Sequence, residues 1–231
     1  MSMKIAFISD IHSNIHALSA VIEEIEKENI DEIYCCGDIV GYNAFPGECI
    51  ELVDKYVKAS VRGNHDHATI NGDTIWFNEY GVAGINYCRK VLSDEKIKFL
   101  ESLPTHLHFN REGIKFYMVH GSPRNELFEY IFPSTSEETF EEFSISVDAN
   151  VVVLGHTHIP MKRKIGETLF LNPGSVGQPR DGNPKASFVI FDCKNKEAVF
   201  RRVNYNIEEA KRAIIDKGLP LFLAERLDLG I

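Results

Sequence analysis

Residues of the kind that bind metal ions occur in five short clusters, and each cluster follows directly after a short apolar run. The clusters are Asp10-Ile11-His12, Gly37-Asp38, Gly63-Asn64-His65-Asp66, His120-Gly121 and Gly155-His156-Thr157-His158. Loops that follow the carboxyl ends of strands meet at one edge of an α/β sheet, so we expect the five clusters to form one site. Because none of them contains cysteine, they argue against a structural zinc site.

The side chains of this site suit more than one metal ion. The candidate ligands are Asp10, His12, Asp38, Asn64, His120, His156 and His158. Two carboxylates, one amide and four imidazoles are too many for one tetrahedral ion, and they are typical of two divalent ions that share a bridging carboxylate. Mixed ligands of this kind suit several metals. We expect manganese first, with iron, zinc, nickel and cobalt as alternatives.

Short apolar strands alternate with amphipathic helices, which is the pattern of an α/β protein. Strands are predicted over 4–9, 32–36, 59–62, 115–119, 151–154, 168–171, 186–191 and 198–203. Helices are predicted over 15–28, capped by Asn14, and over 47–57, preceded by Pro46. A third helix is predicted after Ser93, and a fourth at the capping box Thr135-x-x-Glu138. A last helix is predicted to begin at Asn206 and to end at Gly218 and Pro220. The aromatic-rich segment 69–104 reads as helical.

Composition indicates a folded, acidic globular protein. Of its residues 44% are hydrophobic and 26% charged, and the formal net charge is −9. No run of 18 apolar residues and no signal peptide is found, so we expect a cytoplasmic protein without a membrane partner. The acidic balance argues against nucleic acid as a partner. Five cysteines without a CxxC pair predict reduced thiols.

The absence of repeats or linkers predicts one domain. Residues 1–231 form it, and a helical insertion at about 69–104 is expected to cap the site. Met1 and Met3 are alternative starts.

The order of the clusters resembles the motif set of the calcineurin-like metallophosphoesterases. Within that family the chain is most similar to the short single-domain phosphodiesterases of bacteria and archaea, because Asn172-Pro173-Gly174-Ser175 resembles the motif that follows their last ligands. The resemblance implies a four-layer αββα sandwich, in which two mixed β-sheets pack face to face with helices outside. It also implies two ligand sets that share Asp38: Asp10, His12, Asp38 and His158 for one ion, and Asp38, Asn64, His120 and His156 for the other.

The same resemblance implies a phosphodiesterase that cleaves a small nucleotide-like diester by in-line attack of a metal-bridging hydroxide. His65 is expected to protonate the leaving oxygen or to stabilise its charge, with Asp66 orienting the ring. Serine/threonine phosphatases of the superfamily carry an arginine shortly after the second aspartate, whereas residues 37–43 contain no basic side chain. A diester is therefore favoured. The alternatives are a dinucleoside polyphosphate hydrolase, a phosphomonoesterase and a non-catalytic scaffold.

Fewer residues point to the substrate, which we expect to be a small phosphate ester. Asn14, Asn43, Arg124 and Arg180 are candidates for binding it, because amides and guanidinium groups donate hydrogen bonds to phosphate. Trp76, Phe77 and Tyr80 are candidates for stacking a base, although such aromatic residues more often belong to the core. Family resemblance also predicts a homo-oligomer.

Overall fold

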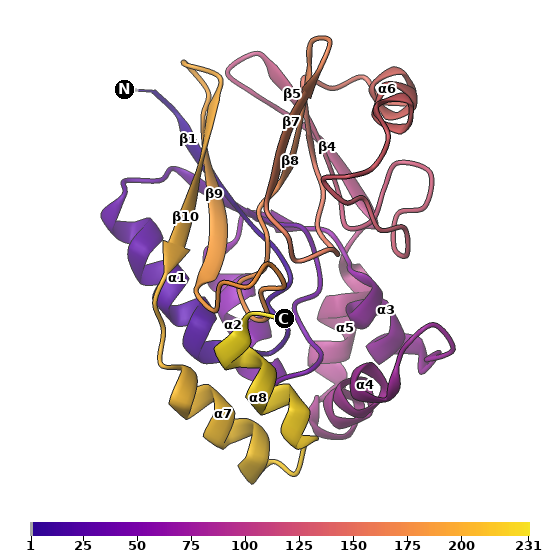
Figure 1. Cartoon of the computed structure of the whole chain (residues 1–231), viewed down its shortest axis with the longest axis vertical. Coiled ribbons are helices and arrows are strands. Elements are labelled where there is room, and N and C mark those ends of the chain that lie inside the picture. The colour runs from indigo at the N-terminus through magenta and orange to yellow at the C-terminus, as the bar shows by residue number, and fades with distance from the viewer. Residues whose placement is uncertain (1) are drawn as a thin grey trace.

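The computed structural model describes residues 2–231, so the alternative start at Met1 lies outside the described residues. Two mixed five-stranded sheets pack face to face (Figure 1). The first has the order β10-β9-β1-β2-β3 and contains β1 (Lys4–Ile8), β2 (Glu32–Cys35), β3 (Ala59–Ser60), β9 (Ala186–Asp192) and β10 (Glu197–Val203). The second has the order β4-β5-β6-β8-β7 and contains β4 (His106–Arg111), β5 (Ile114–Val119), β6 (Val151–Val153), β7 (Met161–Ile165) and β8 (Thr168–Asn172).

Helices cover the outer faces of the sandwich, which confirms the αββα architecture (Figure 1). The helices are α1 (Ile15–Lys27), α2 (Pro46–Tyr56), α3 (Asn64–Asn71), α4 (Glu79–Val91), α5 (Asp94–Ser102), α6 (Glu137–Ser146), α7 (Ile207–Asp216) and α8 (Leu221–Leu229). Of these, α1 and α2 pack on the first sheet and α6 on the second, whereas α7 and α8 lie beyond the strand ends. Asn14 caps α1 through a bond from the Ala17 amide, as predicted. No helix within residues 2–231 is long and apolar enough to cross a membrane.

A hydrophobic core lies between the two sheets and holds them together. It contains buried aromatic and branched side chains from both, such as Phe7 and Phe191 from the first sheet and Phe116 from the second. Strands β1, β2 and β3 are parallel to one another, as are β5, β6 and β8. Their carboxyl ends therefore point to common edges of the sandwich, where ligand-bearing loops can meet.

Strands β4 and β7 and helix α8 were not predicted from the sequence, and α3 begins at Asn64, before the helical segment predicted from residue 69. Strand β4 is an edge strand with alternating exposure, and β7, whose sequence is MKRKI, is a charged edge strand. Helix α8 follows Pro220 directly, because this proline serves as its N-cap. Two boundaries also differ: α6 is capped by Ser136 rather than Thr135, and β3 ends at Ser60.

Candidate metal centre

The fold brings all seven predicted ligands together. Their loops follow the carboxyl ends of β1, β2, β3, β5 and β6, so both sheets contribute to one site. Backbone hydrogen bonds join these loops: the amide of Asp10 donates to the Gly37 carbonyl at 3.0 Å, and the amide of His12 donates to the Asp38 carbonyl at 3.0 Å. All seven side chains are buried.

The backbone around the ligands is strained. Asp10, His12, Asp38, His156 and His158 have φ between 48° and 68°, which is the left-handed region that residues with a Cβ rarely adopt. Such conformations persist only where the surrounding structure imposes them, and they concentrate at functional sites. Five strained ligands in one cluster therefore indicate that the site is selected for chemistry rather than for stability.

The rings of His12 and His158 face each other through their Nε2 atoms, an arrangement that suits a bound cation. Their Nε2 atoms are 3.0 Å apart, while Nδ1 of each ring bonds a backbone carbonyl, that of Val40 at 3.1 Å and that of Gln178 at 2.6 Å. A carbonyl only accepts, so Nδ1 carries the hydrogen and a neutral ring presents a lone pair at Nε2. Two lone pairs at this distance repel each other unless a positive charge lies beside them.

A second group of acceptors converges on His120. Its Nδ1 donates to the Cys36 carbonyl at 2.8 Å. Its Nε2 lies 2.9 Å from Asn64 Oδ1, 3.2 Å from His156 Nδ1 and 3.4 Å from Asp38 Oδ2. Despite burial, the negative charge of Asp38 raises the pKa of His120 to about 9. The acceptors around His120 thus favour a positive charge at this point of the centre.

Asp38 links the two groups. Its Oδ2 is 3.6 Å from His12 Nε2 and 3.4 Å from His120 Nε2, while its Oδ1 accepts from the His65 amide. Asp10 Oδ1 lies 3.2 Å from His158 Nε2 and has no hydrogen-bond donor. The residues therefore fit two cations that share Asp38, one beside Asp10, His12 and His158 and the other beside Asn64, His120 and His156.

The remaining rings of the centre are kept neutral. Burial lowers the pKa of His12 and of His158, and it lowers the pKa of His156 to about 3. A histidine must be unprotonated to bind a metal ion, so these rings are already in the ligating form at neutral pH. The backbone bonds to Nδ1 of His12 and His158 fix which nitrogen faces the centre.

Gly63 leaves room for the carboxylate of Asp38, the predicted bridging ligand. A Cβ on Gly63 would collide with the carboxylate and the backbone nitrogen of Asp38. Gly63 also caps α3, and that helix begins with Asn64. The motif Gly-Asn-His-Asp thus combines a close approach of two loops with the placement of an amide ligand.

His65 lies at the edge of the metal-type cluster. Its ring contacts the rings of His12, Tyr42 and Phe77, with centroids 4.7, 4.4 and 4.8 Å away. Burial lowers the pKa of His65 to about 4, so the ring is neutral at pH 7. A neutral imidazole can still donate one hydrogen bond to a leaving oxygen.

The expected role of Asp66 is corrected by the structure. Its carboxylate does not orient His65 but accepts three backbone N–H groups, from Asp38 and Gly63 at 2.9 Å each and from Val40 at 3.1 Å. Asp66 is the third residue of α3, and its carboxylate reaches back to the loop after β2. It therefore fixes the backbone that carries Asp38, the predicted bridging ligand.

The two predicted substrate-binding amides lie in structural positions. Asn14 Oδ1 caps α1 and its Nδ2 donates to the Gly177 carbonyl at 2.9 Å. Asn43 Nδ2 donates to the His12 carbonyl at 2.8 Å. Both side chains are buried and hold loops beside the centre, and neither is among the residues that line the adjacent cavity.

The two predicted arginines differ in position. Arg124 pairs with Glu129 and Glu142 at the surface and does not line the cavity beside the centre. Arg180 does line that cavity, and its amide donates to the His158 carbonyl. Only Arg180 is therefore placed near the ligands.

A cavity of about 320 Å³ opens beside the metal-type cluster. It is lined by Tyr42, Asn64, His65, Trp76, Phe77, Asn78, Tyr130, Arg180 and Arg226. Trp76 and Phe77 come from the predicted insertion, whereas Tyr80 packs on Phe222 of α8 instead. Sequence reasoning missed four lining residues, Tyr42, Asn78, Tyr130 and Arg226. Tyr130 stacks on His156 with centroids 3.7 Å apart, and no sequence motif marked it.

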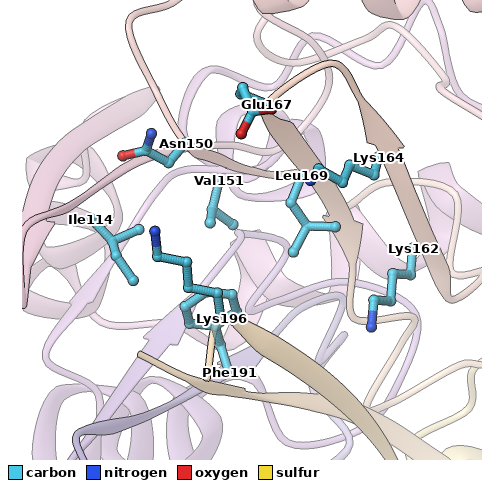
Figure 2. Close-up of a pocket in the computed structure, with 9 residues that line it drawn as sticks. All are labelled: Ile114, Asn150, Val151, Lys162, Lys164, Glu167, Leu169, Phe191 and Lys196. Atoms are coloured by element: carbon cyan, nitrogen blue, oxygen red, sulfur yellow. The ribbon is translucent and has the colours of Figure 1, made fainter. Parts of the chain in front are cut away.

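A larger cavity, of about 540 Å³, lies at the opposite end of the strands and is lined by none of the predicted metal ligands. Figure 2 shows Ile114, Val151 and Leu169 on its floor, with Lys196 reaching across from the β9–β10 turn. Ile114 and Val151 are the first residues of β5 and β6, so this cavity is at the amino ends of strands whose carboxyl ends carry His120 and His156. The smaller cavity is therefore the one placed for chemistry.

Comparisons with known proteins agree with this geometry. A sequence model of the calcineurin-like phosphoesterase superfamily domain matches residues 3–196. An uncharacterised protein of Methanocaldococcus jannaschii is 41% identical over 98% of both chains. The phosphodiesterase YfcE of Escherichia coli is 26% identical over 82% of this chain and 88% of its own. The crystal structure of a metallophosphoesterase from Sphaerobacter thermophilus superposes with a TM-score of 0.87 and 33% identity, over 100% of both chains.

Proposed function

The chain belongs to the calcineurin-like phosphoesterase superfamily, and from this membership we propose that it is a two-metal-dependent phosphodiesterase that hydrolyses a small phosphodiester. The observation that carries the proposal is the convergence of metal-binding atoms on Asp38 Oδ2, which lies 3.6 Å from His12 Nε2 and 3.4 Å from His120 Nε2. A carboxylate oxygen between two such groups is the arrangement of a shared ligand.

The metal ions would supply Lewis acidity and a water of lowered pKa when bound. Asp10, His12, Asp38 and His158 would hold one, and Asp38, Asn64, His120 and His156 the other. We propose manganese first for both positions. The donor set would equally accept iron, zinc, nickel or cobalt, because imidazole and carboxylate are ligands for all of them.

The chain's own residues would bind and orient the ester. Arg180 lines the cavity beside His158 and would donate to a phosphate oxygen. His65, at the boundary between the ligands and the cavity, would donate a hydrogen bond to the leaving oxygen. This requires only the neutral ring, which is the form present at pH 7.

Two observations support a diester over a monoester. No basic side chain occurs in residues 37–43, where protein phosphatases of the superfamily carry an arginine. The relative YfcE is named a phosphodiesterase. A diester carries one negative charge, and a monoester carries close to two, so a site with fewer cations near the bridging ligand favours the diester.

The decisive experiment is a hydrolysis panel on manganese-reconstituted protein. It compares bis(p-nitrophenyl) phosphate, p-nitrophenyl phosphate, cyclic nucleotides and a dinucleoside tetraphosphate. We expect the diester to be cleaved faster than the monoester, with activity lost in Asp38→Asn and kept in Asp148→Asn, which changes an exposed carboxylate. Faster monoester or tetraphosphate turnover would replace the proposal with one of those activities, and no turnover with any substrate would favour a non-catalytic scaffold.

A further inference from the structure

One wall of the cavity beside the metal-type cluster is built by the last helix, outside the segment that the superfamily model matches. Helix α8 lies between α7 and α4 (Figure 1). Leu223 and Leu227 of α8 pack in one cluster with Tyr42. The amide of Gly182 donates to the Gly230 carbonyl at 2.9 Å, which ties the end of α8 to the loop after Arg180. These contacts bring Arg226 to the cavity.

Arg180 and Arg226 lie on the same aromatic ring. Their guanidinium carbons are 5.7 and 5.9 Å from the centroid of Tyr42. Arg180 bonds Gln178 and the Tyr42 hydroxyl through Nη2, but its buried Nε has no partner. Arg226 donates from Nε to the main-chain oxygen of Ile231, the last residue of the sequence, at 2.6 Å, and within residues 2–231 neither terminal nitrogen of Arg226 has a hydrogen-bond partner.

These two arginines differ from most others in the chain, because no ion pair joins either of them to a carboxylate side chain within residues 2–231. Arg111, Arg124, Arg163, Arg201 and Arg202 each pair with one. Burial and repulsion from Arg180 lower the pKa of Arg226 to about 10, which leaves the Arg226 guanidinium charged at pH 7. Two like charges that line one cavity and have donors to spare form a site that an anion completes.

We propose that Arg226, together with Arg180, forms an anion subsite for a second phosphate group, one that is not cleaved, so that the substrate is a phosphodiester carrying a further phosphate. The proposal rests on the proposed function, because it places the scissile phosphate at the metal ligands. Arg180 lies nearer those ligands, and Arg226 lies beyond it at the α8 wall. Trp76, Phe77 and Tyr130 line the rest of the cavity and offer apolar surface to the organic part of a nucleotide.

A matched pair of chromogenic esters tests the subsite. Thymidine 5′-(p-nitrophenyl phosphate) is a simple diester, and its 3′-phosphorylated form differs only by the second phosphate. We expect wild type to prefer the phosphorylated form by about tenfold or more in kcat/KM, the size of a charge-assisted hydrogen bond. Arg226→Gln should bring that ratio close to one, and Arg226→Lys should restore part of it. Arg212→Gln, which removes an exposed arginine on α7 away from the cavity, should keep the wild-type ratio.

A binding measurement separates failure of the subsite from failure of the proposed function. Trp76 is the only tryptophan of the chain and lines the cavity, so its fluorescence reports ligand binding without turnover. We expect thymidine 3′,5′-bisphosphate to bind about tenfold tighter than thymidine 5′-monophosphate, and the difference to vanish in Arg226→Gln. Equal binding of the two nucleotides, or an unchanged difference in Arg226→Gln, would overturn the subsite. If neither ester is cleaved but the binding difference holds, the subsite stands and the proposed hydrolysis fails.

Discussion

The Nε2 atoms of His12 and His158 lie 3.0 Å apart, although the two residues are 146 positions apart in the sequence and belong to loops of different sheets. Each ring is held from behind by a backbone carbonyl. Two lone pairs so placed repel each other, and a cation bound beside them would relieve that repulsion.

Metal binding should stabilise the fold. Removal of metal with a chelator should lower the melting temperature, and manganese should raise it, by a free energy of about 2.7 kcal/mol at a metal concentration 100-fold above Kd. Differential scanning calorimetry with metal analysis measures both. His158→Ala should lose the manganese-dependent rise, whereas His108→Ala, in the partly exposed strand β4, should keep it. A rise of equal size in both variants would show that the ion binds elsewhere.

His65 should contribute to turnover but not to metal binding. We expect His65→Ala to retain two metal ions per chain and to lose about 10²–10³-fold in kcat, the usual contribution of one positioned hydrogen-bond donor to developing negative charge. His67→Ala is the matched control, because this neighbouring ring is only partly buried and bonds Asn71. Metal content by emission spectroscopy and diester kinetics separate the two roles. Full activity of His65→Ala would remove this residue from the mechanism.

Asp66 should act through the backbone of the loop that carries Asp38. Asp66→Asn replaces a carboxylate that accepts three N–H groups with an amide whose NH₂ cannot accept. We expect a loss of about 2–3 kcal/mol in the free energy of unfolding, because buried donors are left unpaired, and weaker metal binding with it. Urea unfolding in the presence of a chelator measures the first effect and metal titration the second. Unchanged stability with reduced kcat alone would instead return Asp66 to a role beside His65.

Glu32 should make the contact between the sheets sensitive to acid. Its carboxylate, on β2, accepts from Arg111 of β4 at 2.6 Å and from the Tyr34 hydroxyl at 2.8 Å. Burial raises the pKa of Glu32, but these hydrogen bonds outweigh it and leave the pKa below its ordinary value of 4.5. A carboxyl whose pKa is lowered by folding contributes stability above its unfolded pKa and loses it as the pH falls through the folded one.

Wild type should therefore be more stable than Glu32→Gln at pH 7, by about 1 kcal/mol for this partly exposed pair. The difference should shrink as the pH falls below 4.5. Denaturant unfolding at several pH values measures it, with Asp148→Asn at an exposed pair as the control. A difference that does not change with pH would show that the lost packing, and not the charge, is responsible.

Much of the centre was predictable because two features of the sequence identify its predicted ligands, the residue type and the apolar strand that precedes each of them. Asp10, Asp38 and His120 are of metal-binding type, and each follows a strand that is apolar enough to recognise. Strands β1 and β2 are parallel neighbours, so Asp10 and Asp38 lie at the same end of the first sheet, and the packing of the second sheet against it brings His120 to them. The sandwich of two sheets followed from the family resemblance carried by these motifs.

Strands β4 and β7 and helix α8 escaped prediction for two different reasons. Strands β4 and β7 are at edges, where one face is wet and charged side chains replace the apolar alternation. Helix α8 follows Pro220, a residue that in sequence reads as the end of α7. With α8 unpredicted, Arg226 could not be assigned to any site.

The sequence alone determined which side chains can bind metal and which strand each of them follows. Both depend only on residue type and on position along the chain. Tertiary structure decided what each neighbour of the ligands does. It showed Asp66 holding backbone amides, Asn14 and Asn43 holding loops, and Arg124 paired at the surface. It also brought Tyr130 and Arg226 to the cavity. These roles depend on which distant segments pack together, and the direction and partners of a side chain are fixed only when they do.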